Sequence, residues 1–254
     1  MRSVKGMSVL VTGGGSGIGE ATARLLIAAG ARVTITGRRQ EKIAAVQSAL
    51  GEACCAVAGD VTVADDRERM LEAALAHGGG RLDALVNNAA NMYRQPVDGY
   101  SEEFLKEAFD TNVISAMMLS SAAVPALAET QGAIIFIGST HTRRAFPGAS
   151  PYATTKAALE GLTKVMAAEL GPRQIRVGCI LPGAVMTELN LRSGHVKPEE
   201  AKARYADVAG LHALGRIGTA DEVAESIIHL ISAEWITGVA LEVDGGIGLG
   251  VSNF

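Results

Sequence analysis

The chain has 254 residues, of which 48% are hydrophobic and 20% charged, and its formal net charge at pH 7 is −4. A chain of this length can bury a large core as one α/β domain and needs no disulfide or metal for support. The mild negative charge, without any basic run, argues against nucleic acid or an anionic membrane as a partner.

Strands and helices are predicted to alternate along the whole chain, without a linker, a repeat or a low-complexity segment. Short apolar runs predict buried strands at residues 7–12, 32–36, 54–58, 82–87, 132–138, 175–181 and 238–243. Segments of helical composition predict helices at residues 17–29, 39–50, 64–77, 101–109, 112–129, 151–170 and 220–232. This alternation predicts a single domain over residues 1–254, with a Rossmann-type, doubly wound, mostly parallel sheet of about seven strands and helices on both faces.

A glycine-rich loop joins the first predicted strand to the first predicted helix. Gly13, Gly17 and Gly19 have the spacing G-x-x-x-G-x-G, which differs from the G-x-G-x-x-G of the common dinucleotide fingerprint. Glycines let the backbone approach a pyrophosphate, and the free N–H groups and dipole at a helix start favour an anion. The strand–loop–helix order therefore predicts a phosphate cradle. The alternative is a loop of small residues with a structural role only.

The end of the second predicted strand indicates which cofactor is preferred. Enzymes that use NAD usually place an acidic residue here, which accepts hydrogen bonds from the ribose 2′-hydroxyl. This chain instead has Gly37 followed by Arg38 and Arg39, and guanidinium groups suit a 2′-phosphate. The pattern favours NADP(H) over NAD(H). The alternative is that both arginines begin the solvated face of a helix.

Cysteine usage and the N-terminus bear on the cellular compartment. Cys54 and Cys55 are adjacent and Cys179 stands alone, so the three form neither a disulfide framework nor a metal pattern. The first ten residues hold no apolar signal-peptide core, and no uninterrupted apolar stretch reaches membrane-spanning length. We therefore expect a reducing compartment and a cytoplasmic protein.

A tyrosine and a lysine share one face of the predicted helix 151–170. Tyr152 and Lys156 lie four residues apart, so their side chains project a turn apart. An ammonium group beside a phenol favours the phenolate and lowers the tyrosine pKa, which suits a proton shuttle. Ser139, after the predicted strand 132–138, could hydrogen-bond the oxygen that gains or loses the proton. Alone, the Y-x-x-x-K spacing is a weak signal, and an ordinary surface helix is the alternative.

The polar motifs fall at or just past the ends of predicted strands. This holds for Gly13, Asp60, Asn87, Ser139 and Pro182. In open parallel sheets the ligand lies beyond the carboxyl ends of the strands. We therefore expect these residues to converge on one edge of the sheet.

Taken together, these motifs resemble those of the short-chain dehydrogenase/reductase family, and the resemblance covers nearly the whole chain. The matching segments are the TGxxxGIG loop at Thr12–Gly19, the pair Asp60-Val61, the NNAG-like segment Asn87–Ala90, the tetrad Asn112, Ser139, Tyr152 and Lys156, the PGxxxT segment Pro182–Thr187, and the C-terminal signatures Thr237-Gly238 and Val243–Gly246. The one departure is Ala90 in place of Gly, which adds only a methyl group.

The resemblance implies a role for each matched residue. Ser139 would polarise the substrate oxygen and Tyr152 would transfer the proton. Lys156 would lower the tyrosine pKa and hold the nicotinamide ribose, and Asn112 would hold a water that links Lys156 to solvent. Asn112 also starts the predicted helix 112–129, where it could be an N-cap. The residues expected to bind the cofactor are Gly13, Gly15, Ser16, Gly17, Ile18, Gly19, Arg38, Arg39, Asp60, Val61, Asn88, Ala89, Ala90, Tyr152, Lys156, Pro182, Gly183, Val185 and Thr187.

The sequence indicates less about the substrate than about the cofactor. The segment 186–214 mixes apolar and charged residues and is predicted to cover the substrate pocket as a lid. His141 could face the pocket. Arg143 and Arg144 could attract an anionic group of the substrate, or they could be solvated or lie in a subunit contact. The histidines of the lid segment, His195 and His212, show no metal-ligand spacing, so no metal is expected.

The sequence thus predicts a cytoplasmic NADP(H)-dependent oxidoreductase that interconverts a ketone and a secondary alcohol. One alternative is an NAD(H)-linked polyol or sugar-alcohol dehydrogenase, and another is a non-catalytic dinucleotide-sensing regulator that kept the fold. The family resemblance suggests a homotetramer or homodimer, with helices 101–129 and 151–170 as the contacts.

Overall fold

The computed structural model describes residues 1–189 and 205–250. At its centre lies a seven-stranded sheet in the order β3-β2-β1-β4-β5-β6-β7, in which every neighbouring pair of strands is parallel. The order reverses between β1 and β4, which is the switch point of a doubly wound fold. The strands are β1 (Ser8–Thr12), β2 (Arg32–Gly37), β3 (Cys54–Ala58), β4 (Ala84–Asn87), β5 (Ala133–Ile137), β6 (Arg176–Pro182) and β7 (Val239–Val243).

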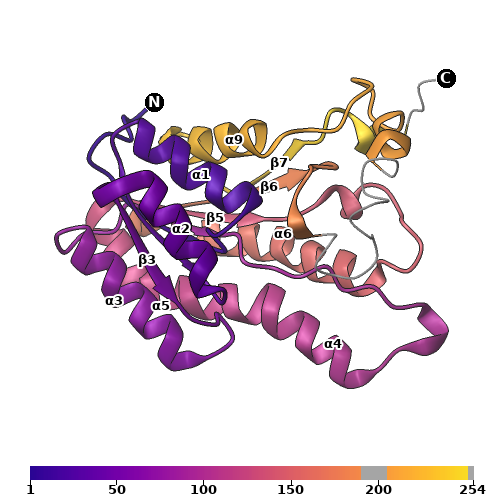
Figure 1. Cartoon of the computed structure of the whole chain (residues 1–254), viewed down its shortest axis with the longest axis horizontal. Coiled ribbons are helices and arrows are strands. Elements are labelled where there is room, and N and C mark those ends of the chain that lie inside the picture. The colour runs from indigo at the N-terminus through magenta and orange to yellow at the C-terminus, as the bar shows by residue number, and fades with distance from the viewer. Residues whose placement is uncertain (190–204, 251–254) are drawn as a thin grey trace.

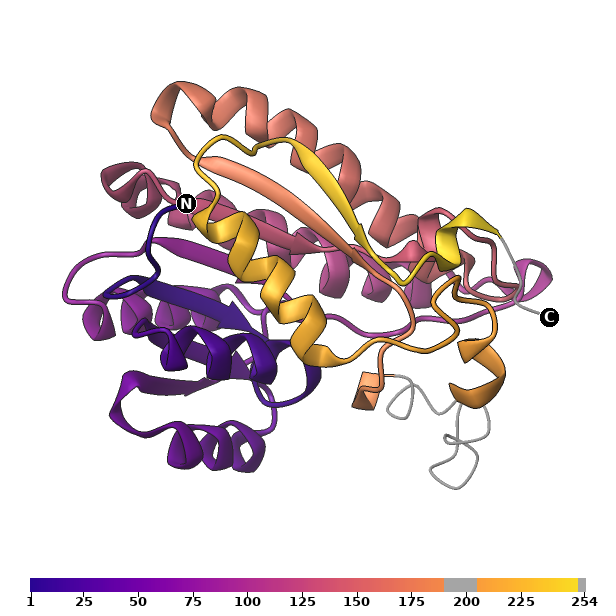
Figure 2. The same ribbon diagram turned by 90° about the horizontal axis from the view of Figure 1, so that it is seen from above.

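Helices join the strands and cover both faces of the sheet (Figure 1). One face is covered by α1 (Gly17–Ala28), α2 (Gln40–Leu50) and α9 (Ala220–Ser232), and Figure 2 shows α1 and α9 side by side. The other face is covered by α3 (Ala64–His77), α5 (Ser115–Thr130) and α6 (Ser150–Leu170). This arrangement confirms the predicted single-domain, Rossmann-type fold.

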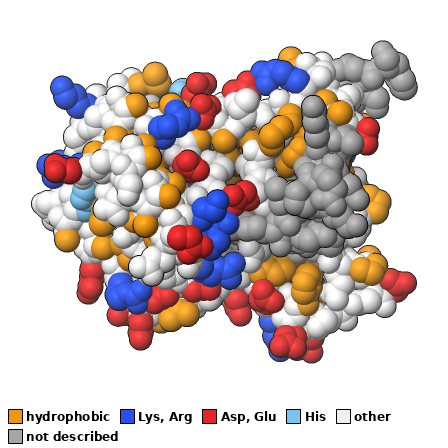
Figure 3. Space-filling model, in the orientation of Figure 1, with side chains coloured by type: hydrophobic (Ala, Val, Ile, Leu, Met, Phe, Trp, Pro, Cys, Tyr) orange, Lys and Arg blue, Asp and Glu red, His pale blue; other side chains and the backbone are white. Residues whose placement is uncertain are grey.

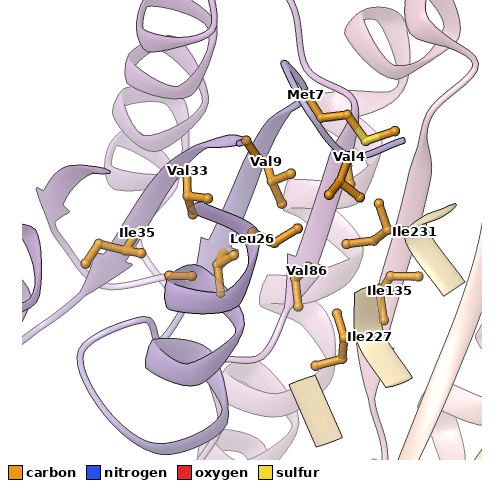
Figure 4. Close-up of a cluster of buried hydrophobic side chains, with 14 of the residues drawn as sticks. Val4, Met7, Val9, Leu26, Val33, Ile35, Val86, Ile135, Ile227 and Ile231 are labelled. Carbon is orange, nitrogen blue, oxygen red and sulfur yellow. The ribbon is translucent and has the colours of Figure 1, made fainter. Parts of the chain in front are cut away.

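Each face of the sheet has its own apolar cluster because side chains alternate along a strand. Val9 and Val11 belong to the cluster beneath α1 and α9, whereas Leu10 belongs to the cluster beneath α5 and α6. Figure 4 shows the first cluster, in which Leu26 of α1 and Ile227 of α9 lie against the strands. Burying one such side chain stabilises the fold by about 1.5–3 kcal/mol. The two clusters therefore fix the strands, and with them the loops at their carboxyl ends.

The predicted strands agree with the structure to within two residues at each end, and most helices agree as well. The exception is the pair predicted at 101–109 and 112–129. These segments form one continuous helix, made of α4 (Glu102–Phe109), a π-helical stretch (Asp110–Ile114) and α5. The interpretation of Asn112 as an N-cap is therefore wrong. The stretch Asp110–Ile114 contains no Pro or Gly that would end a helix, and Asn112 lies buried inside it.

The joined helix Glu102–Thr130 is long and apolar enough to cross a membrane, by length and composition alone. Its α5 part packs against α3 and against β4 and β5, and it contributes Leu119, Ala123 and Leu127 to the second cluster. Core helices of soluble proteins pass the same test of length and composition, so this helix is weak evidence for a membrane span. Its other side exposes Ile114, Met117 and Met118.

Candidate active site

A cavity of about 330 Å³ lies at the carboxyl edge of the sheet. The loops that follow β1, β2, β3, β4, β5 and β6 all contribute to its wall, so the motifs converge as the strand pattern predicts. Two predicted site residues, Gly19 and Asn112, are not in this wall, and neither is Asn87, whose side chain instead donates to Ser120. The predicted residues that line the cavity are Gly13, Gly15, Ser16, Gly17, Ile18, Arg38, Arg39, Asp60, Val61, Asn88, Ala89, Ala90, Ser139, Tyr152, Lys156, Pro182, Gly183, Val185 and Thr187.

Tyr152 and Lys156 line the cavity from consecutive turns of α6, and both are more than nine-tenths buried. The Lys156 ammonium group donates a hydrogen bond of 2.7 Å to the carbonyl oxygen of Ile137, at the end of β5. The same ammonium group lies 5.5 Å from the centre of the Tyr152 ring. Pro151 in the first turn of α6 suits a helix start immediately before the tyrosine.

Burial dominates the ionisation of this pair. It raises the pKa of Tyr152 to about 12, although hydrogen bonding with Ser139 and the charge of Arg94 act in the opposite direction. Burial also lowers the pKa of Lys156 to about 8. The net pKa of Tyr152 therefore lies above its ordinary value, and the lowering of this pKa by Lys156 stays a prediction. Removing the phenolate from water costs more than the neighbouring charges contribute.

Ser139 stands two residues past β5 and contacts His141 twice. The backbone N–H of His141 donates to the Ser139 hydroxyl oxygen at 3.2 Å, and Nδ1 of His141 lies 3.0 Å from the same oxygen. The His141 ring lies between Phe146, with ring centres 4.6 Å apart, and Tyr152, with ring centres 5.2 Å apart and nearly perpendicular planes. His141 also lines the cavity, as predicted.

Asn112 lies behind the cavity wall and connects three segments. Its Oδ1 accepts a hydrogen bond of 2.9 Å from the backbone N–H of Asn91, and its Nδ2 donates to the Asn91 carbonyl at 3.0 Å and to Thr155 Oγ1 at 3.1 Å. Both amide hydrogens are thus engaged. Asn112 therefore fixes the loop after β4 relative to α6. The water-holding role implied by the family resemblance stays a prediction.

The glycine loop is built to admit an anion at the start of α1. Ser16, the N-cap residue, makes no side-chain capping bond, so it does not occupy the first backbone N–H groups of the helix. Gly17 has a φ of +57° and lies so close to Thr187 that a Cβ there would be 3.1 Å from the threonine methyl group. Asn88 holds the loop from behind, because its Nδ2 donates to the carbonyls of Thr12 and Gly13. These features fit the pyrophosphate of a dinucleotide.

Gly19 lies beneath the loop rather than at its surface. A Cβ at this position would collide with the carbonyl oxygen of Gly13 and would lie 2.6 Å from Asn88 Nδ2. Only glycine therefore lets the helix start pack so closely under the loop. The contribution of Gly19 to the cradle is indirect, through the backbone that it admits.

The two arginines after β2 both pair with carboxylates on the cavity wall. Arg38 lies 3.6 Å from Asp60, and its side chain is 58% exposed. Arg39 donates to Glu188 at 2.8 Å and to Ser16 at 3.3 Å, and Lys42 reaches the same carboxylate at 3.2 Å. The hydrogen bond from Arg39 is the largest cause that lowers the pKa of Glu188. Glu188 thus joins the segment after β6 to the start of α2, across the cofactor end of the cavity.

The substrate side of the cavity is described in part. Leu189, Tyr205 and Val208 from the predicted lid segment 186–214 line the cavity, whereas His195 lies outside the described residues. Arg143 is not in the wall, because its guanidinium group pairs with Glu160 of α6 and with Glu242 of β7. The described residues contain no group of three or more His, Cys, Asp or Glu that could hold a metal ion.

The sequence reasoning missed three residues that shape the cavity. Glu188 was not recognised as the partner of Arg39, although it directly follows the predicted cofactor residue Thr187. Phe146 packs against the His141 ring at a tilted angle, and Arg94 carries a charge that affects the ionisation of both His141 and Tyr152. Arg94 and Phe146 lie in segments without a recognisable motif, so no sequence signal identifies them.

Comparisons with known proteins agree with this geometry. A family model described as enoyl-(acyl carrier protein) reductase matches residues 13–248. The chain is 35% identical to L-xylulose reductase of Bos taurus over 246 residues, which cover 95% of this chain and 96% of that protein. A crystal structure of 3-ketoacyl-(acyl-carrier-protein) reductase from Brucella melitensis, complexed with NADH, matches with a TM-score of 0.88 and 31% identity, covering 97% of this chain and 100% of that one. A short-chain dehydrogenase/reductase from Serratia marcescens matches with a TM-score of 0.88 and 35% identity, over 97% of this chain and 100% of that one.

Proposed function

Because the chain belongs to the short-chain dehydrogenase/reductase family, we propose that it is an NADP(H)-dependent enzyme in which Tyr152 exchanges a proton with a ketone or secondary alcohol. Family membership makes it an oxidoreductase that acts on CH–OH or C=O groups with a nicotinamide dinucleotide. The observation that carries the proposal is that Ser139, Tyr152 and Lys156 line the same cavity as the glycine loop.

In the proposed reaction the cofactor transfers the hydride and the protein transfers the proton. When bound, the nicotinamide supplies or accepts the hydride. Ser139 hydrogen-bonds the substrate oxygen, and Tyr152 donates a proton to that oxygen in reduction or removes it in oxidation. A pKa of about 12 keeps Tyr152 protonated at neutral pH, which is the form that reduction requires. Lys156 and Thr187, which line the same cavity, would hold the nicotinamide end of the cofactor.

The preference for NADP(H) rests on the residues after β2. The strand ends at Gly37, and no acidic residue stands there to accept hydrogen bonds from a ribose 2′-hydroxyl. The half-exposed guanidinium group of Arg38 lines the cavity and can bind a 2′-phosphate. Arg38 thus favours NADP(H), whose ribose carries a 2′-phosphate, over NAD(H).

The partners proposed are a small-molecule substrate and further copies of this chain, and the proposed location is the cytoplasm. Basic and acidic side chains are interspersed on the face shown in Figure 3, without a broad basic area outside the grey residues, which suits a small-molecule substrate better than nucleic acid. Four large apolar side chains are exposed on two helices, namely Ile114, Met117 and Met118 of the long helix and Val165 of α6. A homotetramer or homodimer that forms through these helices would cover them. Cytoplasmic location remains a proposal based on cysteine usage.

A substrate and cofactor panel tests the function directly. The purified protein is incubated with NADPH and with NADH, each against ketones that include sugars, cyclic ketones and 3-oxoacyl thioesters. The reverse direction is tested with the matching alcohols. Oxidation of NADPH in the presence of a ketone, at a higher kcat/KM than with NADH, supports the proposal. Tyr152→Phe, which keeps the ring and removes the hydroxyl, is the matched control for background cofactor oxidation.

The same panel separates the alternatives. An NAD(H)-linked polyol or sugar-alcohol dehydrogenase would turn over polyols with NAD⁺ and would show little preference for NADP⁺. A non-catalytic dinucleotide sensor would bind cofactor and turn nothing over. The sugars in the panel are of particular interest because the chain is similar to L-xylulose reductase.

A further inference from the structure

The hydrogen-bonding state of His141 can be worked out from the atoms around it. Burial, with the charges of Arg94 and Lys156, lowers the pKa of His141 to about 4, so the imidazole is neutral near pH 7. A neutral imidazole has one N–H donor and one acceptor nitrogen. Nδ1 lies 3.0 Å from the Ser139 hydroxyl oxygen, whereas Nε2 is buried and has no hydrogen-bond partner among the described residues.

The missing partner of Nε2 favours one tautomer. With the proton on Nε2, a buried N–H group would have no acceptor, which is rarer in proteins than an unsatisfied acceptor. With the proton on Nδ1, that group donates to Ser139, and only an acceptor lone pair is left unsatisfied. Contacts with the rings of Phe146 and Tyr152 hinder a turn of the imidazole that would exchange its nitrogens.

This tautomer decides what the serine hydroxyl can do. The Ser139 oxygen already accepts the backbone N–H of His141 at 3.2 Å, and the Nδ1–H of the same residue fills its second lone pair. Both acceptor positions are then occupied, so the Ser139 proton must be donated elsewhere. A hydroxyl that donates to a neighbouring oxygen favours negative charge on that oxygen.

We propose that His141 is a positioning residue that makes the Ser139 hydroxyl an obligate hydrogen-bond donor to the reacting oxygen. The proposal rests on the proposed function, in which Ser139 binds the substrate oxygen. A serine that both donates and accepts can turn its proton away from the substrate. A serine whose lone pairs are both filled by His141 presents its proton to the oxygen on which negative charge develops in reduction, and it needs no reorganisation during the step. The unsatisfied Nε2 lone pair is the local cost of this arrangement.

The kinetic test is a double-mutant cycle between Ser139 and His141. His141→Phe keeps a flat ring between Phe146 and Tyr152 and removes both nitrogens. We expect kcat to fall by about 10- to 100-fold, as misplacement of a catalytic group does, while the Kd for NADPH is unchanged. His141→Asn, whose side-chain amide can donate near the position of Nδ1, should recover most of the loss. In the Ser139→Ala background, adding His141→Phe should change kcat less than threefold.

An equal loss in the wild-type and Ser139→Ala backgrounds would overturn the proposal, because His141 would then act without the serine. Failure of His141→Asn to recover any activity, when it folds and binds NADPH normally, would also count against it. These outcomes differ from a failure of the proposed function, in which the wild-type protein itself would turn over no ketone or alcohol.

Nuclear magnetic resonance of the ring nitrogens gives a readout that does not depend on activity. The wild-type protein is labelled with ¹⁵N-histidine, and the His141 signal is assigned by its absence from His141→Phe or His141→Asn. The proton is expected on Nδ1 at pH 7. A proton found on Nε2 would overturn the proposal even if both variants were slow. The measurement is feasible because the chain has only five histidines.

Discussion

The ammonium group of Lys156 lies 5.5 Å from the centre of the Tyr152 ring, and burial shifts both pKa values in the direction that favours the neutral side chain. The pKa of the tyrosine rises to about 12 and that of the lysine falls to about 8. The pair therefore brings two groups into a site where neither charged form is favoured, which is typical of groups that transfer or direct protons.

Replacing Tyr152 by Phe should abolish most of the activity without unfolding the protein. The substitution removes the only hydroxyl proposed to move the proton and keeps the buried ring. We expect kcat to fall by about 10²- to 10⁴-fold, with little change in the Kd for NADPH or in the unfolding temperature. Steady-state kinetics and cofactor titration check this. Near-normal turnover by Tyr152→Phe would overturn the proposed mechanism.

Replacing Lys156 by Met should change how stability depends on pH. The folded pKa of Lys156 is about 8, below the ordinary value of 10.5, so between these pH values the unfolded chain binds more protons than the folded one. The free energy of unfolding of the wild type should therefore rise with pH across this window, relative to Lys156→Met. Each unit of pKa difference corresponds to about 1.4 kcal/mol, so a relative rise of about 1–3 kcal/mol is expected.

Urea denaturation at several pH values measures this difference. Lys106→Met is the surface control, because the Lys106 side chain is 71% exposed. Parallel pH dependences for the wild type and Lys156→Met would show that burial does not depress the lysine pKa in the folded protein.

Replacing Arg38 by Asp should weaken NADPH binding far more than NADH binding. The variant loses a charged hydrogen-bond donor to the 2′-phosphate, which is worth about 1.5–3 kcal/mol, or roughly 10- to 150-fold in Kd. The new carboxylate would also lie near Asp60 and would repel the phosphate. Fluorescence titration with both reduced cofactors checks the prediction. Equal losses would show that Arg38 is structural, and a wild-type preference for NADH would overturn the NADP(H) proposal.

Replacing Glu188 by Gln should strengthen NADPH binding slightly. The Glu188 carboxylate neutralises Arg39 and Lys42 at the cofactor end of the cavity, and the amide would leave more positive charge there. Half-exposed pairs of this kind contribute about 0.2–1 kcal/mol, so we expect a change of about 1.4- to 5-fold that shrinks with added salt. NADH binding should change less. Equal weakening for both cofactors would instead indicate that Glu188 mainly holds the segment after β6 in place.

Two glycine substitutions should have opposite effects. In Gly19→Ala, the new methyl group meets the Gly13 carbonyl and Asn88, so the loop must move, and we expect a loss of about 1–3 kcal/mol of stability and much weaker cofactor binding. Gly161→Ala lies inside α6 with no atom within 4 Å of the added Cβ, so we expect a gain of about 0.5–1 kcal/mol. Thermal unfolding and NADPH titration of both variants test the contrast.

Much of the fold could be predicted from the sequence because buried parallel strands are short apolar runs that helical segments separate. The runs at β1 and β5 are wholly buried, and their composition alone marks them as strands. Composition also predicts a break between α4 and α5, and there it is wrong. The polar residues Asp110, Thr111 and Asn112 suggest a helix start by composition, whereas the structure continues the helix through them and engages the Asn112 side chain with Asn91 and Thr155.

The candidate site was predictable where it follows local motifs and unpredictable where it depends on distant pairs. Arg39 and Glu188 are 149 residues apart in the chain, and no periodicity relates them. The direction of the Tyr152 pKa shift was also beyond the sequence, because the nearby charge can be read from the Tyr-Lys spacing but the degree of burial cannot. His141 was recognised as facing the pocket, whereas its contact with Ser139 required the turn after β5.

The π-helical stretch Asp110–Ile114 holds one residue more than a regular α-helix would need to join α4 to α5. Deleting one residue there would let a regular helix join α4 to α5 in nearly their present relative positions. Glu107 would keep its contact with the Tyr93 hydroxyl, now at 3.0 Å, whereas the residues of the stretch itself would change place around the helix. A single-residue deletion at this point should therefore disturb the hydrogen bonds of Asn112 to Asn91 and Thr155 more than the packing of α4.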